Sequence, residues 1–65
     1  MRLTINGEVR DADAATVTAL IAELGLDARK VAVELNLRIV PKSTYEATAL
    51  ADGDRLEIVQ FVGGG

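Results

Sequence analysis

Near its start the chain reads Arg2-Leu3-Thr4-Ile5-Asn6-Gly7-Glu8-Val9-Arg10. Polar and apolar residues alternate on both sides of an Asn-Gly pair, which readily adopts the two positive φ angles of a type I′ turn, so this segment predicts a β-hairpin. A strict two-residue turn places Val9 on the opposite face from Leu3 and Ile5. A longer loop or a bulge would restore a single apolar face, so the register at Val9 is left open.

A helix is predicted after the hairpin, because apolar residues recur there at helical spacing. The stripe consists of Val17, Leu20, Ile21 and Leu24. Thr16 is a suitable N-cap, and Gly25 suits the left-handed residue that ends a helix.

Further strands are predicted in the second half of the chain. Residues 31–35 alternate and end at Asn36, and residues 37–40 form a short strand that Pro41 stops, since proline cannot donate to a sheet ladder. Residues 55–62 make the longest alternating segment.

The order of these elements favours an α+β fold with a mixed four- to five-stranded sheet packed on one main helix. A last strand lying beside the first would bury the apolar faces of both. A hairpin followed by a helical crossover resembles the ubiquitin-like β-grasp fold. We therefore expect residues 1–62 to form one β-grasp domain and residues 63–65 to form a flexible glycine tail.

The composition excludes several classes of site. With 49% hydrophobic residues but only Tyr45 and Phe61 as aromatics, the core must be aliphatic. No cysteine or histidine is present, which excludes disulfides, Cys/His zinc sites and thiol or imidazole catalysis. The net charge is −3 and the basic residues are scattered, so no nucleic-acid partner is expected. No apolar stretch is long enough to span a membrane, and we expect a soluble cytoplasmic protein.

Residues of the last predicted strand alternate between two faces. Leu56 and Ile58 are the better partners for the helix, so Val59 and Phe61 should point outward. An exposed aromatic near the chain end is a plausible docking anchor for a partner protein, although a neighbouring strand could instead cover Phe61.

Three other side chains have simpler interpretations. The ring of Tyr45 is expected to close the core, with its hydroxyl reaching water. Lys30 and Lys42 are interpreted as ordinary solvated charges, and we assign them no role.

The chain finishes on Gly63-Gly64-Gly65, where the α-carboxylate is the only ionisable group. Glycines allow close approach and almost any backbone conformation, so such a segment could present its carboxylate to an enzyme. A frayed chain end is the simpler alternative.

Two longer segments carry a family resemblance. They are Arg38-Ile39-Val40-Pro41-Lys42-Ser43-Thr44-Tyr45 and Leu50-Ala51-Asp52-Gly53-Asp54-Arg55-Leu56-Glu57-Ile58. Together with Thr4-Ile5-Asn6-Gly7 and the diglycine Gly64-Gly65, they resemble the ThiS family of thiamine-biosynthesis sulfur carriers.

The resemblance implies that Gly65 is the modified residue. In this family an adenylating, ThiF-like enzyme uses ATP and magnesium to convert the terminal carboxylate into an acyl-adenylate. A persulfide donor then supplies the sulfur of a thiocarboxylate, which a ThiG-like thiazole synthase uses to build the thiazole of thiamine. The carrier is thus expected to be a co-substrate, not an enzyme, with no cofactor or metal of its own.

Other functions fit the same features. Sulfur carriers for molybdopterin synthase, for tRNA thiolation or for amino-acid synthesis share the diglycine end. A β-grasp binding module with an incidental glycine end, or a modifier linked to lysines, is a more distant alternative.

Overall fold

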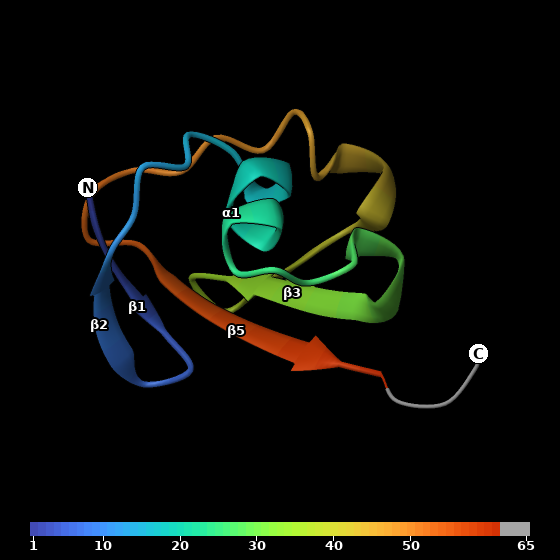
Figure 1. The fold of residues 1–65 in the computed structure, drawn as a ribbon, viewed down its shortest axis with the longest axis horizontal. Helices are drawn as coiled ribbons and strands as arrows, with labels where there is room; N and C mark the ends of the chain where they lie inside the picture. Colours follow the sequence, from blue (N-terminus) through green and yellow to red (C-terminus); the bar gives the residue numbers. More distant parts are fainter. Residues whose placement is uncertain (62–65) are drawn as a thin grey trace.

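The computed structural model describes residues 1–61, which fold into a five-stranded sheet with one α-helix across one face (Figure 1). The elements are β1 (Arg2–Ile5), β2 (Glu8–Asp11), α1 (Val17–Glu23), the 3-10 helix η1 (Ala28–Lys30), β3 (Val31–Leu35), β4 (Arg38–Val40), the 3-10 helix η2 (Lys42–Thr44) and β5 (Arg55–Gln60). The arrangement confirms the predicted α+β class and β-grasp fold.

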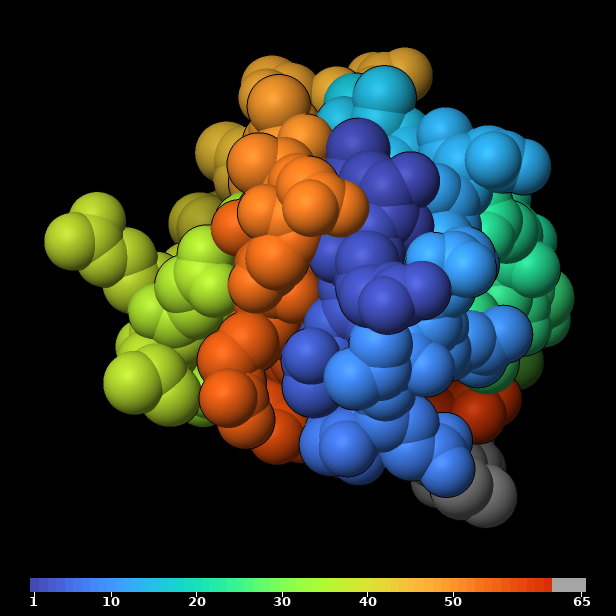
Figure 2. Space-filling view, turned by 90° about the vertical axis from the view of Figure 1, so that its left-hand side faces the viewer, coloured from blue at the N-terminus to red at the C-terminus, as the bar shows by residue number. Residues whose placement is uncertain are grey.

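The sheet has the strand order β2-β1-β5-β3-β4. β5 lies between β1 and β3, parallel to β1 and antiparallel to β3, so the last strand does lie beside the first. From the N-terminal side, β1 in dark blue packs along the orange segment that leads into β5 (Figure 2). β5 ends at Gln60 instead of reaching the predicted position 62, which lies outside the described residues together with 63–65.

The first hairpin keeps the strict two-residue register. Asn6 and Gly7 have φ angles of 50° and 83°, as a type I′ turn requires, and Ile5 pairs with Glu8. The bulge considered for Val9 is therefore not formed, and Val9 stays on the outer face of the sheet with 63% of its surface exposed. The side chain of Asn6 hydrogen-bonds to the backbone of β5, which fixes the turn where it is.

A second two-residue turn joins β3 to β4. Asn36 and Leu37 have φ angles of 51° and 69°, so the fourth strand begins at Arg38 and not at Leu37 as predicted. Asn36 ties this turn to β5, because its side-chain oxygen accepts a hydrogen bond from the N–H of Arg55 at 3.0 Å. The yellow-green β3–β4 region protrudes from the body of the molecule (Figure 2).

The helix begins and ends as the sequence predicted. Thr16 Oγ1 accepts a hydrogen bond from the Ala19 N–H at 3.2 Å, and Gly25 follows the last turn with φ 75°. The helix buries Val17, Leu20 and Ile21 against the inner face of the sheet. The fully buried side chains opposite them include Leu3, Val31 and Leu56, so the core is aliphatic.

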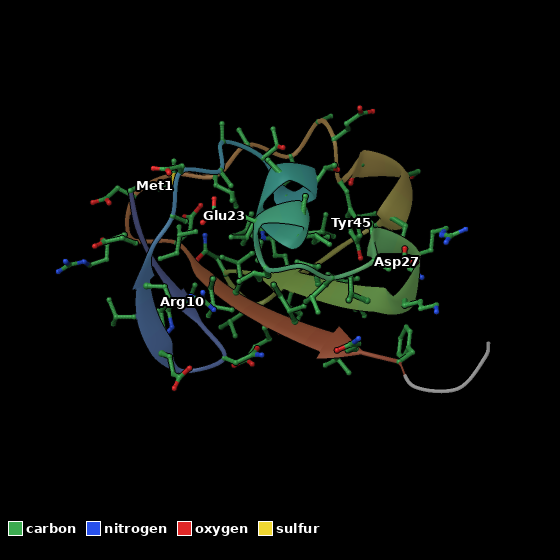
Figure 3. The ribbon with its side chains drawn as sticks, viewed as in Figure 1. Met1, Arg10, Glu23, Asp27 and Tyr45 are labelled. Atoms are coloured by element: carbon green, nitrogen blue, oxygen red, sulfur yellow. The ribbon has the colours of Figure 1, made fainter. Side chains whose placement is uncertain are left out.

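Tyr45 is the one aromatic residue of the core, and only 4% of it is exposed. Its side chain points toward β3 (Figure 3), where the hydroxyl donates a hydrogen bond to the carbonyl of Val31 at 3.0 Å. The expectation that the hydroxyl reaches water is wrong, because the hydroxyl is buried and donates its hydrogen bond to the Val31 carbonyl instead. Burial raises the pKa of Tyr45 above its usual value.

Within residues 1–61 no helix is both long enough and apolar enough to cross a membrane.

Candidate functional site

The candidate site is the end of β5, where the chain continues toward the glycines. Gln60 pairs with Val31, and the N–H of the next residue, Phe61, donates to the carbonyl of Lys30 at 2.7 Å. The backbone is thus held against η1 one residue beyond the strand. Because of this bond, the polypeptide leaves the sheet from a fixed point.

Val59 and Phe61 are exposed, as predicted, with 57% and 53% of their surfaces accessible. Leu56 and Ile58 are buried under the helix, so strand alternation places Val59 on the outer sheet face, opposite α1. Ile39 of β4 is on the same face and is 79% exposed. The outer sheet face therefore offers an apolar surface that extends toward the chain end.

The sheet register sets two carboxylates among these apolar side chains. Glu34 and Glu57 lie directly opposite each other on β3 and β5, two residues along the strands from the Ala32–Val59 pair. Neither carboxylate forms an ion pair with another residue in the described part of the chain. The outer sheet face therefore carries the Glu34–Glu57 pair among exposed apolar side chains.

Lys42 contacts Phe61 from a different part of the fold. Its ammonium nitrogen lies 5.6 Å from the centre of the Phe61 ring and donates a hydrogen bond to the carbonyl of Arg29 at 2.8 Å. An ammonium over an aromatic ring is attracted by the electrons of the ring face. The interpretation of Lys42 as an ordinary solvated charge did not foresee these two contacts.

The segment that carries Lys42 is fixed at both ends. Pro41, with φ −62°, precedes η2, and its carbonyl accepts hydrogen bonds from the N–H and the hydroxyl of Thr44, both at 2.9 Å. Tyr45 then anchors the segment in the core, and its carbonyl accepts from the N–H of Thr18 at 3.2 Å. The η2 turn therefore presents Lys42 to Phe61 from a rigid support.

The η1 turn, which also contacts Phe61, is capped as well. Asp27 (Figure 3) accepts from the Arg29 N–H at 2.9 Å and forms an ion pair with the Arg29 guanidinium at 3.0 Å. The side-chain hydrogen bond from Arg29 is the main reason why the pKa of Asp27 is lowered to about 2. This pair fixes the turn whose last residue, Lys30, accepts the hydrogen bond from the Phe61 backbone.

The acidic residues before β5 accept hydrogen bonds that stabilise the turn leading into that strand. Asp52 accepts a hydrogen bond from the Arg2 N–H, and Asp54 accepts one from the Ala51 N–H at 2.8 Å. Gly53 between them has φ 89°, as the turn requires. In residues 1–61 no group of three or more Asp, Glu, His or Cys side chains is placed to hold a metal ion.

The structure thus brings together part of the predicted site. Val59 and Phe61 are both exposed, as predicted, and Lys42 contacts the Phe61 ring. Gly63, Gly64 and Gly65 lie outside the described residues. The sequence signal that could have pointed to Lys42 is its place directly after Pro41 in the segment that carries the family resemblance.

Comparisons with known proteins place the chain in a family. The model of the ThiS family matches residues 3–65. The sulfur carrier protein ThiS of Bacillus subtilis is 43% identical over 53 residues, which cover 82% of this chain and 80% of that protein. The crystal structure of the thiamine biosynthesis protein ThiS from Geobacter metallireducens matches all of both chains with a TM-score of 0.83 and 39% identity.

A second kind of relative is much longer. The thiazole synthase of Paramagnetospirillum magneticum is 64% identical over 66 residues, which cover all of this chain but only 20% of that protein. The thiazole synthase of Magnetococcus marinus is 42% identical with the same coverage. The chain therefore spans a fifth of the length of these relatives. With the family model matching from residue 3 onward, the chain belongs to the ThiS family.

Proposed function

We propose that this chain is a sulfur carrier of thiamine biosynthesis and that it acts as a co-substrate of other enzymes. The observation that carries this proposal is the match to the ThiS family over residues 3–65, which includes the glycine end as well as the fold. The name of the Bacillus subtilis relative and the fold shared with the Geobacter protein support it.

The proposed chemistry takes place at the carboxylate of Gly65. A terminal carboxylate has a pKa near 3.5, so it is ionised at neutral pH and is a poor electrophile. A ThiF-like enzyme would therefore activate it: a carboxylate oxygen attacks the α-phosphorus of magnesium-bound ATP, and pyrophosphate leaves. The product is an acyl-adenylate, whose acyl carbon is open to nucleophilic attack.

Sulfur then replaces the adenylate. The terminal sulfur of a persulfide attacks the acyl carbon, AMP leaves with the electrons of the carbon–oxygen bond, and an acyl disulfide remains. A second thiolate attacks the other sulfur of that disulfide, which releases the thiocarboxylate and leaves a disulfide on the donor side. The chain itself lacks cysteine, so no internal thiol can intercept the activated carboxyl group.

The proposed consumer of the thiocarboxylate is a ThiG-like thiazole synthase. Two proteins named thiazole synthase contain a segment that matches the whole of this chain. Joining two units in one polypeptide raises their effective concentration, which favours units that act on one another. These relatives therefore support a thiazole synthase as a partner.

The folded domain supplies docking in this proposal. Val59 and Phe61 form an exposed apolar anchor at the end of β5, and exposed aromatics at interfaces often carry a large share of the binding energy. Gly63, Gly64 and Gly65 have no side chains, so a narrow channel could admit them up to the carboxylate.

The test is to incubate the chain with a ThiF-like enzyme, ATP, magnesium and a persulfide donor, and to measure its intact mass. We expect a gain equal to one sulfur in place of one oxygen, located by fragmentation at Gly65. The matched control lacks Gly64-Gly65 and should fold and dock but gain no sulfur. A wild-type chain that only a molybdopterin-pathway enzyme activates would contradict the assignment to thiamine.

A further inference from the structure

Two segments, η1 and η2, contact Phe61, and each contacts a different part of that residue. The carbonyl of Lys30 accepts from the Phe61 N–H at 2.7 Å and so fixes the backbone. The ammonium of Lys42 lies 5.6 Å from the centre of the ring. The same ammonium donates to the Arg29 carbonyl at 2.8 Å, which connects η2 to η1.

The two contacts are separable. The backbone hydrogen bond does not depend on the identity of any side chain, whereas the orientation of the ring depends on what it contacts. Phe61 is 53% exposed, so the core does not hold its ring in place. Lys42 supplies the cation–π contact to this ring.

Restraint of this ring matters for docking. A side chain that must be ordered when two proteins bind reduces the affinity, and an anchor that is ordered beforehand avoids most of that loss. An anchor next to the reacting chain end also sets the direction from which that end enters the partner.

Other charges near Phe61 differ from Lys42 in their contacts. Arg29 is paired with Asp27 at 3.0 Å. The side chain of Lys30 forms no hydrogen bond, ion pair or cation–π contact with any residue in the range 1–61. Glu46 lines the same hollow as Lys42 and Arg29, so it faces these cations. Lys30 therefore carries the charge of Lys42 without its contact to the ring.

We propose that Lys42 is a positioning residue for transfer of the chain end. Its ammonium holds the Phe61 ring in the orientation in which the activating enzyme receives it, while η2 supplies the rigid support. This inference rests on the proposed function, because it concerns the same docking step. It assigns a role to the segment after Pro41, which lies outside the glycine end that carries the chemistry.

Four chains test this role: the wild type, Lys42→Gln, Lys42→Arg and Lys30→Gln. Lys42→Gln keeps a hydrogen-bond donor for the Arg29 carbonyl but removes the positive charge, whereas Lys42→Arg keeps the charge. Lys30→Gln removes one positive charge from a side chain that does not contact the ring. Adenylation by a ThiF-like enzyme with ATP and magnesium gives KM for the chain and kcat. NMR couplings of Phe61 report how its χ1 angle is distributed, and thermal unfolding gives Tm.

We expect Lys42→Gln to raise KM by about three- to tenfold, the size of one lost exposed cation–π contact and the ordering it provides, with kcat and Tm unchanged. Its Phe61 couplings should show averaging over several rotamers. Lys42→Arg and Lys30→Gln should resemble the wild type in KM and in the Phe61 couplings.

A double-mutant cycle shows whether Lys42 acts through Phe61. In a Phe61→Ala background, Lys42→Gln should have no further effect on KM. The proposal is overturned if Lys42→Gln and Lys30→Gln raise KM equally, or if the effect of Lys42→Gln persists without Phe61. If the wild-type chain is not adenylated at all, the proposed function fails, and the Phe61 couplings still decide whether Lys42 orders the ring.

Discussion

Asn6 hydrogen-bonds twice to Ile58: its side-chain oxygen accepts from the Ile58 N–H at 2.8 Å, and its side-chain nitrogen donates to the Ile58 carbonyl at 3.1 Å. β1 pairs with β5 only as far as Ile5 and Leu56. The Asn6 side chain therefore continues the hydrogen bonding to β5 beyond the end of β1. It supports β5, the strand that leads to Phe61.

The Asn6→Gly variant tests these two hydrogen bonds. Glycine accepts the φ angle of 50° at this position, so the substitution removes the side-chain bonds without straining the turn. Two lost hydrogen bonds of ordinary strength should lower the free energy of unfolding by about 1–3 kcal/mol. Urea denaturation measures this change. An unchanged free energy of unfolding would mean that water replaces the Asn6 side chain at no cost.

At Leu37, in the turn between β3 and β4, we expect a glycine substitution to stabilise the fold instead of destabilising it. Leu37 has φ 69° and is 92% exposed, so it occupies a left-handed conformation that disfavours side chains and buries almost nothing in return. Left-handed geometry costs an L-residue roughly 1–2 kcal/mol, and glycine avoids most of this while losing more chain entropy on folding. Leu37→Gly should therefore raise the free energy of unfolding by about 0.5–1 kcal/mol.

The matched control is Leu37→Ala, which shortens the side chain but keeps a Cβ atom at the same φ angle. Its free energy of unfolding should stay close to that of the wild type. If alanine and glycine stabilise the chain equally, exposure of the leucine, not its backbone geometry, is the unfavourable feature.

The ion pair in η1 gives a prediction for acid pH. Hydrogen bonds from Arg29 lower the pKa of Asp27 from 3.8 to about 2. Because the pKa is lower in the folded chain, the stability gained from the charged carboxylate is complete above pH 3.8 and is lost as the pH falls toward 2. An NMR titration of the Asp27 carboxyl carbon should give a midpoint near 2 in the wild type.

In an Arg29→Gln variant the titration midpoint of Asp27 should rise toward 3.8. Part of the lowering should remain, because the backbone N–H of residue 29 still donates to the Asp27 carboxylate. Equal midpoints in the two proteins would contradict the role of the guanidinium.

The residues explain how far sequence reasoning could reach. Asn6-Gly7 and Thr16 act through local geometry, so the hairpin and the helix start were predictable from their immediate neighbours. Val9 shows the limit of the apolar pattern: the turn set the register, and an apolar residue was left on the outer face. An exposed valine costs less than a disrupted ladder.

The other differences arise from tertiary contacts. The hydroxyl of Tyr45 contacts the Val31 carbonyl, and the ammonium of Lys42 contacts the Phe61 ring. Both contacts form only when the chain has folded. Neither contact follows a helical or strand period, so no sequence pattern predicts it. The exposure of Val59 was predictable from strand alternation, whereas Phe61 lies one residue beyond β5, where alternation no longer decides which way a side chain points.

Phe61 and Ile58 provide the final test, since they lie close together on β5 and its extension but differ in burial. Phe61 is 53% exposed and Ile58 is 8% exposed. Phe61→Ala should leave Tm almost unchanged but raise KM for adenylation by more than about tenfold, as expected for a central aromatic anchor. Ile58→Ala should instead lower the free energy of unfolding by about 2–5 kcal/mol, because it opens a cavity in the core. A large loss of stability in Phe61→Ala with normal KM would show that the ring belongs to the core, and Lys42 would then hold a structural side chain instead of a docking anchor.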